Sequence, residues 1–469
     1  MEIITDTYKE KISGVLGCFD RIVITGTLPK ICYSQGMTSF LYSKGIRIFD
    51  YASFVEPYKE QIRTNAEQIA KENGIDIEFV RKSNIRKEDL VQKKIKEQGV
   101  HLGLVHILSA MESCPSYKPW HDKSSGKTFL KGTQGKCLHY YFYFIDEYLG
   151  LGYVRVPTWC PFKLQVYFNG HNILANELDK KGISYTIIDN AFDNISDFER
   201  AQEISDKIDV KKIHKRLDEI AKKYCPVYSD LIATAIHIVK PENIVTFLGK
   251  KLDAKYQGEI GNNYNIRIQG SRIKHIMGKS SIKMYDKFSK ILRIETTTND
   301  VTFFKHYREV EHRDGSRTKN IAPLKKNIYS LSVLKDLFKA SNRRYIEFIS
   351  AIDNKDAGRK RLEKVSQTKK ENNRNYKGFN FFNQTDLSIM LSVLKGQFNI
   401  SGFRNSEIRK LLPALNSGQV SRLFKRLYKH GLIKKVRKTY KYYITKLGKE
   451  VFLTALKLKE TVLIPALNY

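Results

Sequence analysis

Residues 281–297 carry the side chain types that cut nucleic-acid strands. The stretches SIKMYD and ILRIETT alternate apolar and polar residues around a short turn, which predicts a β-hairpin with two distinct faces. Strand pairing would gather four polar side chains on one face, namely Lys283, Tyr285, Arg293 and Glu295. A tyrosine hydroxyl can attack a phosphodiester, a carboxylate can hold a metal or take a proton, and cations stabilise the developing charge. The pattern predicts metal-dependent nicking or strand transfer on DNA, with Mg²⁺ or Mn²⁺ held by Glu295.

The string Lys-x-Tyr-Asp-Lys followed by Leu-Arg-Ile-Glu resembles a motif of rolling-circle replication initiators from plasmids and filamentous phages. The resemblance covers residues 281–295 and implies a role in replication initiation or in mobile DNA. Initiators that bind their metal through two histidines one residue apart differ, because this sequence contains no His-x-His. An exposed hairpin with a cross-strand ion pair would show the same alternation, so a structural role stays open.

A second group of candidates surrounds an aromatic strand predicted for residues 136–146. Alternation places His139, Tyr141 and Tyr143 on one face, and such rings can stack on the bases of single-stranded nucleic acid. Core packing is the alternative, and it is the expected role of the alternate aromatic residues Tyr140, Phe142 and Phe144. His121, His139, His171 and Asp146 also have the donor atoms of a metal site, whereas hydrogen-bonded core histidines are the simpler interpretation.

Two further patterns were weighed for cofactors. The stretch 132–136 contains G-x-x-G-K, but it lacks the spacing of a phosphate-binding loop and precedes a strand, so no nucleotide cofactor is expected. Asp50 and Glu112 end predicted strands, where open sheets place their active sites. Together with Asp20 or Asp146 they form another candidate Mg²⁺ site.

The elements that must position these residues predict an α+β fold. In residues 1–118, strands at 21–25, 45–49, 77–80 and 102–110 alternate with helices at 54–73 and 87–98, which is typical of an α/β layer. Residues 119–352 form a β-rich part that holds the candidate catalytic and nucleic-acid-binding residues. Residues 353–377 are charged and nearly devoid of apolar side chains, so we expect a linker there. A compact module follows over residues 378–469.

The compact module predicts the order helix, helix, helix, basic hairpin, helix, which is that of a winged helix. Its third helix begins after Asn416 and stops at Gly431, and its expected buried stripe is Val420, Leu423, Leu427 and Tyr428. The segment SGQVSRLFKRLYKHGLIKK resembles the recognition helix and wing entry of MarR-type winged-helix regulators.

Polar and basic residues occupy the rest of that helix and the hairpin. Those predicted to contact DNA from the helix are Gln419, Ser421, Arg422, Lys425, Arg426 and Lys429. Those predicted from the hairpin are Lys434, Lys435, Arg437, Lys438 and Lys441. Such a helix fits the major groove, where Gln and Arg read base edges and Lys contacts phosphates. A winged helix used for protein contacts, with solvated lysines, is the alternative.

Composition favours a polyanionic partner. The chain has 469 residues, and its 82 Lys and Arg exceed its 49 Asp and Glu to give a net charge of +33. A content of 41% hydrophobic residues excludes a disordered basic tail. No apolar run is long enough to cross a membrane and no secretory signal is present, so we expect a cytoplasmic protein without a membrane partner. The six widely spaced cysteines favour reduced thiols over a zinc or disulfide framework.

The strings GKCLHYYFYFID, VPTWCPF, FNGHN, SIKMYDK, LRIETTTND and REVEHRD resemble, over nearly the full length, a family of bacterial proteins with a C-terminal MarR-like winged helix. The resemblance implies no chemistry. It implies a longer stretch between residues 226 and 234 than this chain has.

Three functions follow as hypotheses. The first is a DNA-processing protein, such as a replication initiator or a mobile-element nuclease, which the winged helix brings to its site. The second is a non-enzymatic MarR-like transcriptional regulator that binds duplex DNA, in which the large region forms an oligomer or senses a partner. The third is an RNA-binding protein that uses the aromatic strand.

Overall fold

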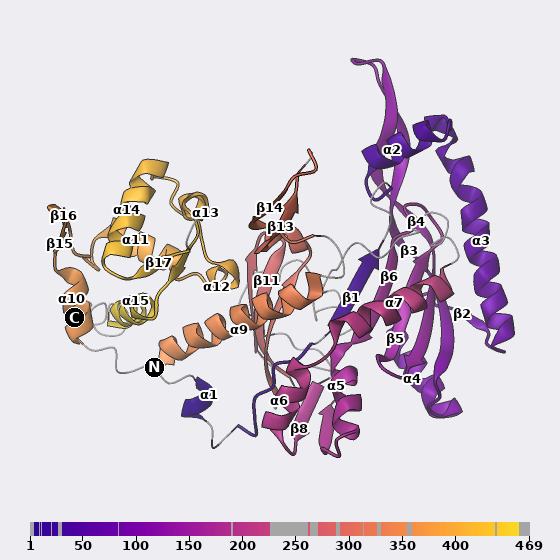
Figure 1. The fold of residues 1–469 in the computed structure, drawn as a ribbon, viewed down its shortest axis with the longest axis horizontal. Coiled ribbons are helices and arrows are strands. Elements are labelled where there is room, and N and C mark those ends of the chain that lie inside the picture. Colours follow the sequence, from indigo (N-terminus) through magenta and orange to yellow (C-terminus); the bar gives the residue numbers. More distant parts are fainter. Residues whose placement is uncertain are drawn as a thin grey trace. The chain divides into compact units, whose positions relative to one another are not determined.

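The structure is a computed structural model, and it mixes helices and strands as an α+β protein does (Figure 1). It describes residues 4–8, 10, 12–19, 21–26, 31–82, 84–188, 191–225, 261–262, 271–287, 291–312, 314–325, 330–353, 359–436 and 439–458. The chain forms two compact units. The sheet unit consists of Gly14–Lys255 and Thr297–Asp336, and the basic unit consists of Met1–Ser13, Tyr256–Thr296 and Leu337–Tyr469. None of the helices in the described ranges combines the length and the apolar character that crossing a membrane requires.

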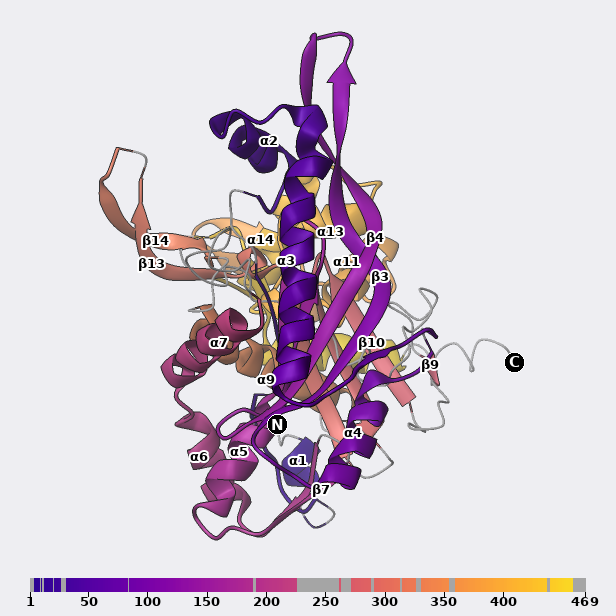
Figure 2. The same cartoon turned by 90° about the vertical axis from the view of Figure 1, so that its right-hand side faces the viewer.

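A six-stranded sheet is the centre of the sheet unit, with the strand order β1-β6-β5-β4-β3-β2. The strands are β1 (Arg21–Gly26), β2 (Ile77–Phe79), β3 (Gly103–Asp122), β4 (Lys127–Asp146), β5 (Gly150–Pro157) and β6 (Leu164–Asn169). Only β2 runs parallel to its neighbour among these pairs. The two longest strands, β3 and β4, extend beyond the ends of the other strands as a two-stranded ribbon (Figure 2).

Strand alternation gives the sheet two buried faces. On one face, the rings of Phe142 and Phe144 stack on Tyr224 of α7 (Val210–Tyr224). On the other face, Tyr141 and Tyr143 pack with residues of α4 (Lys87–Gln98). The remaining elements of this unit are α2 (Ser34–Ser43), α3 (Tyr51–Glu72), α5 (Gly170–Asp179), β7 (Tyr185–Ile188), β8 (Ala191–Ile195), α6 (Phe198–Asp206), η5 (Val301–Phe303), β13 (Lys305–Glu311) and β14 (Arg317–Pro323). Core packing of the aromatic strand, the simpler interpretation of its sequence, is therefore what the structure shows.

Two expectations for this unit were wrong. Residues 45–49 do not form a strand, because Ile46 N–H bonds back to Leu41 O to end α2, and Ile48–Asp50 continues as the short helix η2. The division expected at residue 118 falls inside β3, which pairs with β4 without a break from Gly103 to Asp122 except for one bulge. Residues on both sides of position 118 therefore belong to one sheet.

The basic unit contains a four-stranded sheet with the order β12-β11-β10-β9. Its strands are β9 (Gly261–Asn262), β10 (Ser271–Met277), β11 (Ser280–Lys287) and β12 (Ile291–Thr298), so the predicted hairpin at 281–297 is confirmed. The long helix α9 (Leu331–Asp353) lies on one face of this sheet. Its Tyr345 hydroxyl is hydrogen-bonded to His275 of β10, and its Asn342 accepts a hydrogen bond from Thr296 of β12. The short helix α1 (Ile4–Thr7) also belongs to this unit.

The chain after residue 378 shows the predicted order of elements. They are α11 (Gln384–Val393), the single turn α12 (Phe398–Ser401), α13 (Asn405–Leu411), α14 (Ser417–Lys429), β17 (Ile433–Lys435), β18 (Tyr442–Ile444) and α15 (Lys446–Leu458). Asn416 caps α14 as expected, through a capping box with Gln419. The buried stripe of α14 is Val420, Phe424 and Leu427, whereas Tyr428 is 48% exposed. Phe424 therefore belongs to the buried stripe, which we had assigned to Leu423 and Tyr428, and Leu423 is only half-buried.

The segment 353–377 is not a structureless linker. It contains α10 (Arg359–Ser366) and a hairpin of β15 (Lys369–Glu371) and β16 (Arg374–Tyr376). Ion pairs hold it against the module that follows, because Arg361 contacts Glu450 and Lys429 Nζ lies 2.6 Å from Glu371 Oε1. Composition misled the prediction, since the charged residues find partners outside the segment and Val365 supplies a buried apolar contact.

Candidate functional site

The polar side chains of the β11–β12 hairpin converge as the sequence predicts. Lys283 Nζ lies 2.9 Å from Glu295 Oε1, and the Tyr285 hydroxyl donates a hydrogen bond of 3.4 Å to Glu295 Oε2. The neighbouring strand β10 adds Lys274, which is directly opposite Lys283 in the register. The cluster therefore places two lysines on one face of the sheet, and one of them is paired with a carboxylate.

The side chains of this cluster are buried, so they do not form an open catalytic surface. The exposed fractions are 0% for Lys283, 5% for Tyr285, 8% for Glu295 and 9% for Arg293. A phosphodiester cannot approach the Tyr285 hydroxyl without opening the fold. Glu295 is already contacted by Lys283 and Tyr285, which leaves it poorly placed to bind Mg²⁺ or Mn²⁺. The polar face of the hairpin is thus buried, whereas Leu292 on its apolar face is 59% exposed.

His139, on the large sheet, is a hydrogen-bonded core histidine. Its Nε2 lies 3.1 Å from Arg155 Nη2, and its Nδ1 lies 3.1 Å from the carbonyl oxygen of Cys137. Because arginine can only donate, Nε2 accepts and Nδ1–H donates, which identifies the neutral tautomer. Burial, reinforced by the charge of Arg155, lowers the pKa of His139 to about 4. The lone pair that a metal would need is therefore used by Arg155.

The other metal candidates lie far from His139. Asp146, the last residue of β4, accepts hydrogen bonds from Arg216 (2.6 Å) and from two backbone N–H groups. At about 3.3 Å per residue along a strand, it lies roughly 23 Å from His139. His121 lies near the opposite end of the β3–β4 hairpin, paired with Thr128. Within the described ranges, no three potential ligands come together as a metal site.

Glu112 is the centre of a polar network that we did not predict. It lies within β3 and not at a strand end. Its carboxylate accepts hydrogen bonds from Lys87 Nζ (2.8 Å) and the Tyr141 hydroxyl (2.7 Å), and it forms an ion pair with Arg155 Nη2 (3.0 Å). Burial would raise the pKa of Glu112, but these hydrogen bonds and charges outweigh it and lower the pKa below its usual value. The carboxylate is thus a satisfied anion and a weak base.

The remaining members of the alternative Mg²⁺ site do not join Glu112. Asp50 forms an exposed ion pair with Arg47 at 2.7 Å. Asp20 lies outside the described residues. The sequence signal for the network was available, because Glu112, Tyr141 and Arg155 are polar residues inside otherwise apolar strands at positions that share one face.

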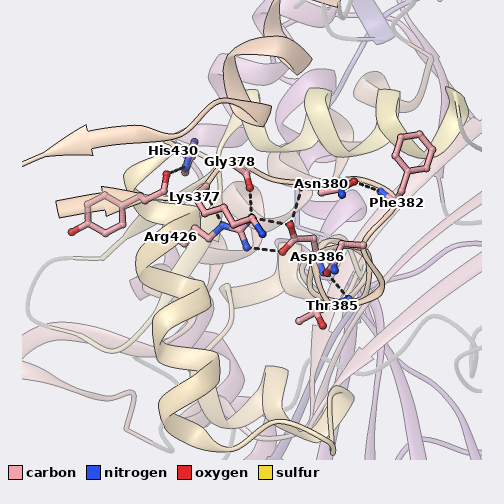
Figure 3. Close-up of polar contacts among 10 residues, drawn as sticks. Lys377, Gly378, Asn380, Phe382, Thr385, Asp386, Arg426 and His430 are labelled. Carbon is pink, nitrogen blue, oxygen red and sulfur yellow. Dashed lines mark hydrogen bonds and ion pairs between the residues drawn. The ribbon is translucent and has the colours of Figure 1, made fainter.

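Arg426 of α14, a predicted DNA contact, is engaged inside the protein (Figure 3). Its guanidinium forms a two-pronged ion pair with Asp386 of α11, at 2.6 and 2.8 Å, and lies 3.9 Å from the ring centre of Phe379. It also donates to the carbonyl oxygens of Lys377 and Gly378. This arginine holds the start of the module onto α14 and is not available to DNA.

Three more predicted residues of α14 have partners in the module or in the segment before it. Lys429 pairs with Glu371, Gln419 completes the capping box with Asn416, and Ser421 accepts a hydrogen bond of 2.8 Å from Asn405. Ser421 is nevertheless exposed, whereas Gln419 and Lys429 are half-buried. The helix periodicity identified the polar face correctly but could not show which side chains reach back to neighbouring elements.

Four predicted cations remain at the surface. Arg422 and Lys425 of α14, and Lys434 and Lys435 of β17, are exposed and form no ion pair with any residue that the structure describes. Lys441 is half-buried and donates to Ser401 Oγ at 3.2 Å. Arg437 and Lys438 lie outside the described residues. The basic face of α14 is therefore narrower than predicted.

The acidic residues of the module do not neutralise the positive charge of this face. Between residues 378 and 458 the sequence contains only three acids, Asp386, Glu407 and Glu450. Asp386 and Glu450 are buried against Arg426 and Arg361, and Glu407 accepts a hydrogen bond from the Arg404 N–H to cap α13. All three carboxylates are thus engaged locally, and the surface cations have no acid beside them in this stretch.

Comparison with known proteins adds no relative, since no family, no curated protein and no solved structure matches this chain.

Proposed function

We propose that the chain binds duplex DNA through residues 378–458, which act as a winged helix with α14 as the recognition helix and β17–β18 as the wing. The proposal rests on which charged side chains of this module have partners and which are exposed. Its three acids are engaged locally, while Arg422, Lys425, Lys434 and Lys435 remain exposed. A surface of this kind attracts the phosphate backbone, and the major groove accommodates an α-helix.

The exposed side of α14 has the composition that base recognition needs. Ser417, Ser421, Arg422 and Lys425 lie along it without a large apolar residue until Tyr428. Arginine recognises guanine edges and lysine contacts phosphates, whereas serine accommodates either. The apolar stripe of Val420, Phe424 and Leu427 anchors the opposite side of the helix in the core.

DNA cleavage by the β11–β12 hairpin is not part of this proposal, because its tyrosine and carboxylate are buried. The proposed role is site-directed binding, as in the regulator hypothesis. It rests on the charge distribution of the module.

Selection of DNA by the full-length protein tests the proposal. The protein is incubated with a pool of randomised duplexes at a fixed salt concentration, and the bound duplexes are sequenced. We expect an enriched motif, bound with an affinity that falls steeply with salt because phosphates are contacted. The Arg422→Ala variant should bind the selected duplex about tenfold more weakly, as expected for the loss of a base contact worth about 1–3 kcal/mol.

A matched control comes from the same module. Lys395 is an exposed lysine that follows α11 and lies outside α14 and the wing. Lys395→Ala should leave the affinity for the selected duplex within about twofold of wild type. Equal affinities of the Arg422→Ala, Lys425→Ala and wild-type proteins would refute the assignment of α14 as the recognition helix.

A further inference from the structure

The β3–β4 ribbon extends beyond the other strands of its sheet as an arm. Strand β2 pairs with β3 at residues 107–109, and β5 pairs with β4 at residues 139–146. From Ser113↔Lys136 to Asp122↔Lys127, the two strands have only each other as strand partners among the residues that the structure describes. Figure 2 shows this ribbon projecting from the sheet, with α2 beside it.

One face of the arm is attached to the protein. The Tyr42 hydroxyl of α2 donates to Thr128 O at 2.9 Å, and Leu130 N–H donates to Thr38 Oγ1 at 2.9 Å. Leu130 is buried, and the Tyr117 hydroxyl donates to Ile31 O at 2.6 Å. These contacts brace the arm from one side and fix which face points outward.

The outward face presents aromatic rings between lysines. Trp120 and Phe129 are directly opposite each other in the register, and they are 43% and 36% exposed. Lys118 and Lys131 are also directly opposite each other. They lie on the same face, two residues closer to the sheet. The Lys131 ammonium lies 4.6 Å from the centre of the Trp120 ring, and that of Lys118 lies 5.9 Å from it.

The single acid of the arm does not offset these lysines. Between residues 113 and 136 the sequence has five lysines and one acid, Asp122. The Asp122 carboxylate accepts hydrogen bonds from the hydroxyls of Ser124 and Ser125, both at 2.7 Å, and so closes the turn at the tip. The lysines therefore remain available to an anionic partner.

We infer that this arm binds single-stranded nucleic acid by stacking an unpaired base on Trp120. Trp120 is partly exposed, and a base can cover the open part of its indole with a flat surface of similar size. The phosphate of a base stacked there lies within reach of Lys118 and Lys131. A base inside a duplex has both faces covered by its stacked neighbours, which favours an unpaired strand. This inference is independent of the duplex contact proposed for α14.

Tryptophan fluorescence tests the inference directly, because the sequence has only two tryptophans. The indole N–H of Trp159 donates to Ser116 Oγ at 2.9 Å, so Trp159 is anchored in the fold. In a full-length Trp159→Phe variant, all tryptophan emission comes from Trp120. Titration with unstructured oligo(dT) or oligo(U) should quench that emission, and the two strands report DNA and RNA separately. Absence of quenching by both strands would overturn the inference.

Variants separate stacking from general attraction. Trp120→Ala should weaken binding of a labelled oligo(dT) about tenfold, as expected for one stacked base worth about 1–3 kcal/mol. Tyr307→Ala removes a ring that is 61% exposed on β13 and should change this affinity by less than twofold. Lys118→Ser and Lys131→Ser should each reduce the salt slope by about 0.7, the value for a phosphate contact in a single strand.

Two outcomes identify other partners. Arg422→Ala, which tests the duplex contact, should leave oligo(dT) binding unchanged; joint loss would show that both ligands use α14 and would overturn the arm's role. Tryptophan and lysine also suit an anionic lipid surface. A blue shift of Trp120 emission with phosphatidylserine vesicles, without any response to oligonucleotides, would likewise overturn the inference.

Discussion

Basic residues are exposed in one part of the basic unit and buried in another part. On α14, Arg422 and Lys425 lie at the surface without an acid beside them. On the β10–β12 sheet, Lys274 and Lys283 are buried, and Lys283 is paired with Glu295 at 2.9 Å. The sequence pattern of both parts is similar, with apolar and polar residues on opposite faces.

The difference lies in what covers the polar face. A helix with one apolar stripe can bury only that stripe, so its polar side faces water unless single residues reach back, as Arg426 does. A strand of an internal sheet has two faces that other elements can cover, and its polar face is then buried only if the charges are paired. Cross-strand charge pairs therefore report burial as readily as they report catalysis.

The strongest test of this contrast is Glu295→Ala. Removal of the carboxylate leaves the buried Lys283 without that charge partner, and such changes cost about 3–5 kcal/mol of the free energy of unfolding. Both tryptophans belong to the sheet unit. In urea, the free energy of unfolding measured by circular dichroism should therefore fall, while the value measured by tryptophan fluorescence should not change. Glu309→Ala, which changes an exposed glutamate on β13, should shift neither by more than about 0.5 kcal/mol. Equal stability of the Glu295→Ala and Glu309→Ala proteins would contradict the buried pair.

Arg426→Ala tests the one arginine of α14 that behaves like the buried sheet residues. It should lower the free energy of unfolding of the basic unit by about 3 kcal/mol, because Asp386 is left buried without its partner. Replacing both residues by apolar ones, Arg426→Met with Asp386→Leu, should restore most of that loss. Thermal unfolding of the two proteins measures the difference, and an additive double variant would show that the pair is not coupled.

A second buried cluster on strands, around His139, should make the stability of the protein depend on pH. The pKa of His139 is lowered to about 4 from an ordinary value of 6.5, so the unfolded chain binds its proton first as the pH falls. Stability from this group is complete above pH 6.5 and is lost progressively as the pH falls towards 4. Between pH 7 and pH 5 the loss is about 2 kcal/mol. The His139→Gln variant, compared with wild type by tryptophan fluorescence, should lack this part of the pH dependence; parallel curves would contradict the buried neutral histidine.

Local sequence patterns predicted the helices and strands of this chain better than they predicted which polar side chains are buried. The α4 helix was predicted with the bounds that it has, because charged and apolar residues alternate there with the helical period. The convergence of Lys283, Tyr285 and Glu295 was also predicted, since strand pairing alone determines it. Their burial was not, because it depends on elements distant in the sequence. The same holds for Arg426, whose partner Asp386 is 40 residues away.

The smallest expected effect concerns the surface side of the contrast, Arg422 and Lys425. Each alanine variant should change the free energy of unfolding by less than about 0.5 kcal/mol, because neither side chain is paired with a described residue. Lys425→Ala should nevertheless reduce the slope of log affinity against log salt by about 0.9, as the loss of one phosphate contact with duplex DNA does, and Arg422→Ala should weaken binding about tenfold. Arg426→Ala should show the reverse pattern, with a large loss of stability and an unchanged slope under conditions where the protein is folded. Because Arg422 and Arg426 are one helical turn apart, unequal responses of these two arginines would separate surface charge from buried charge within a single helix.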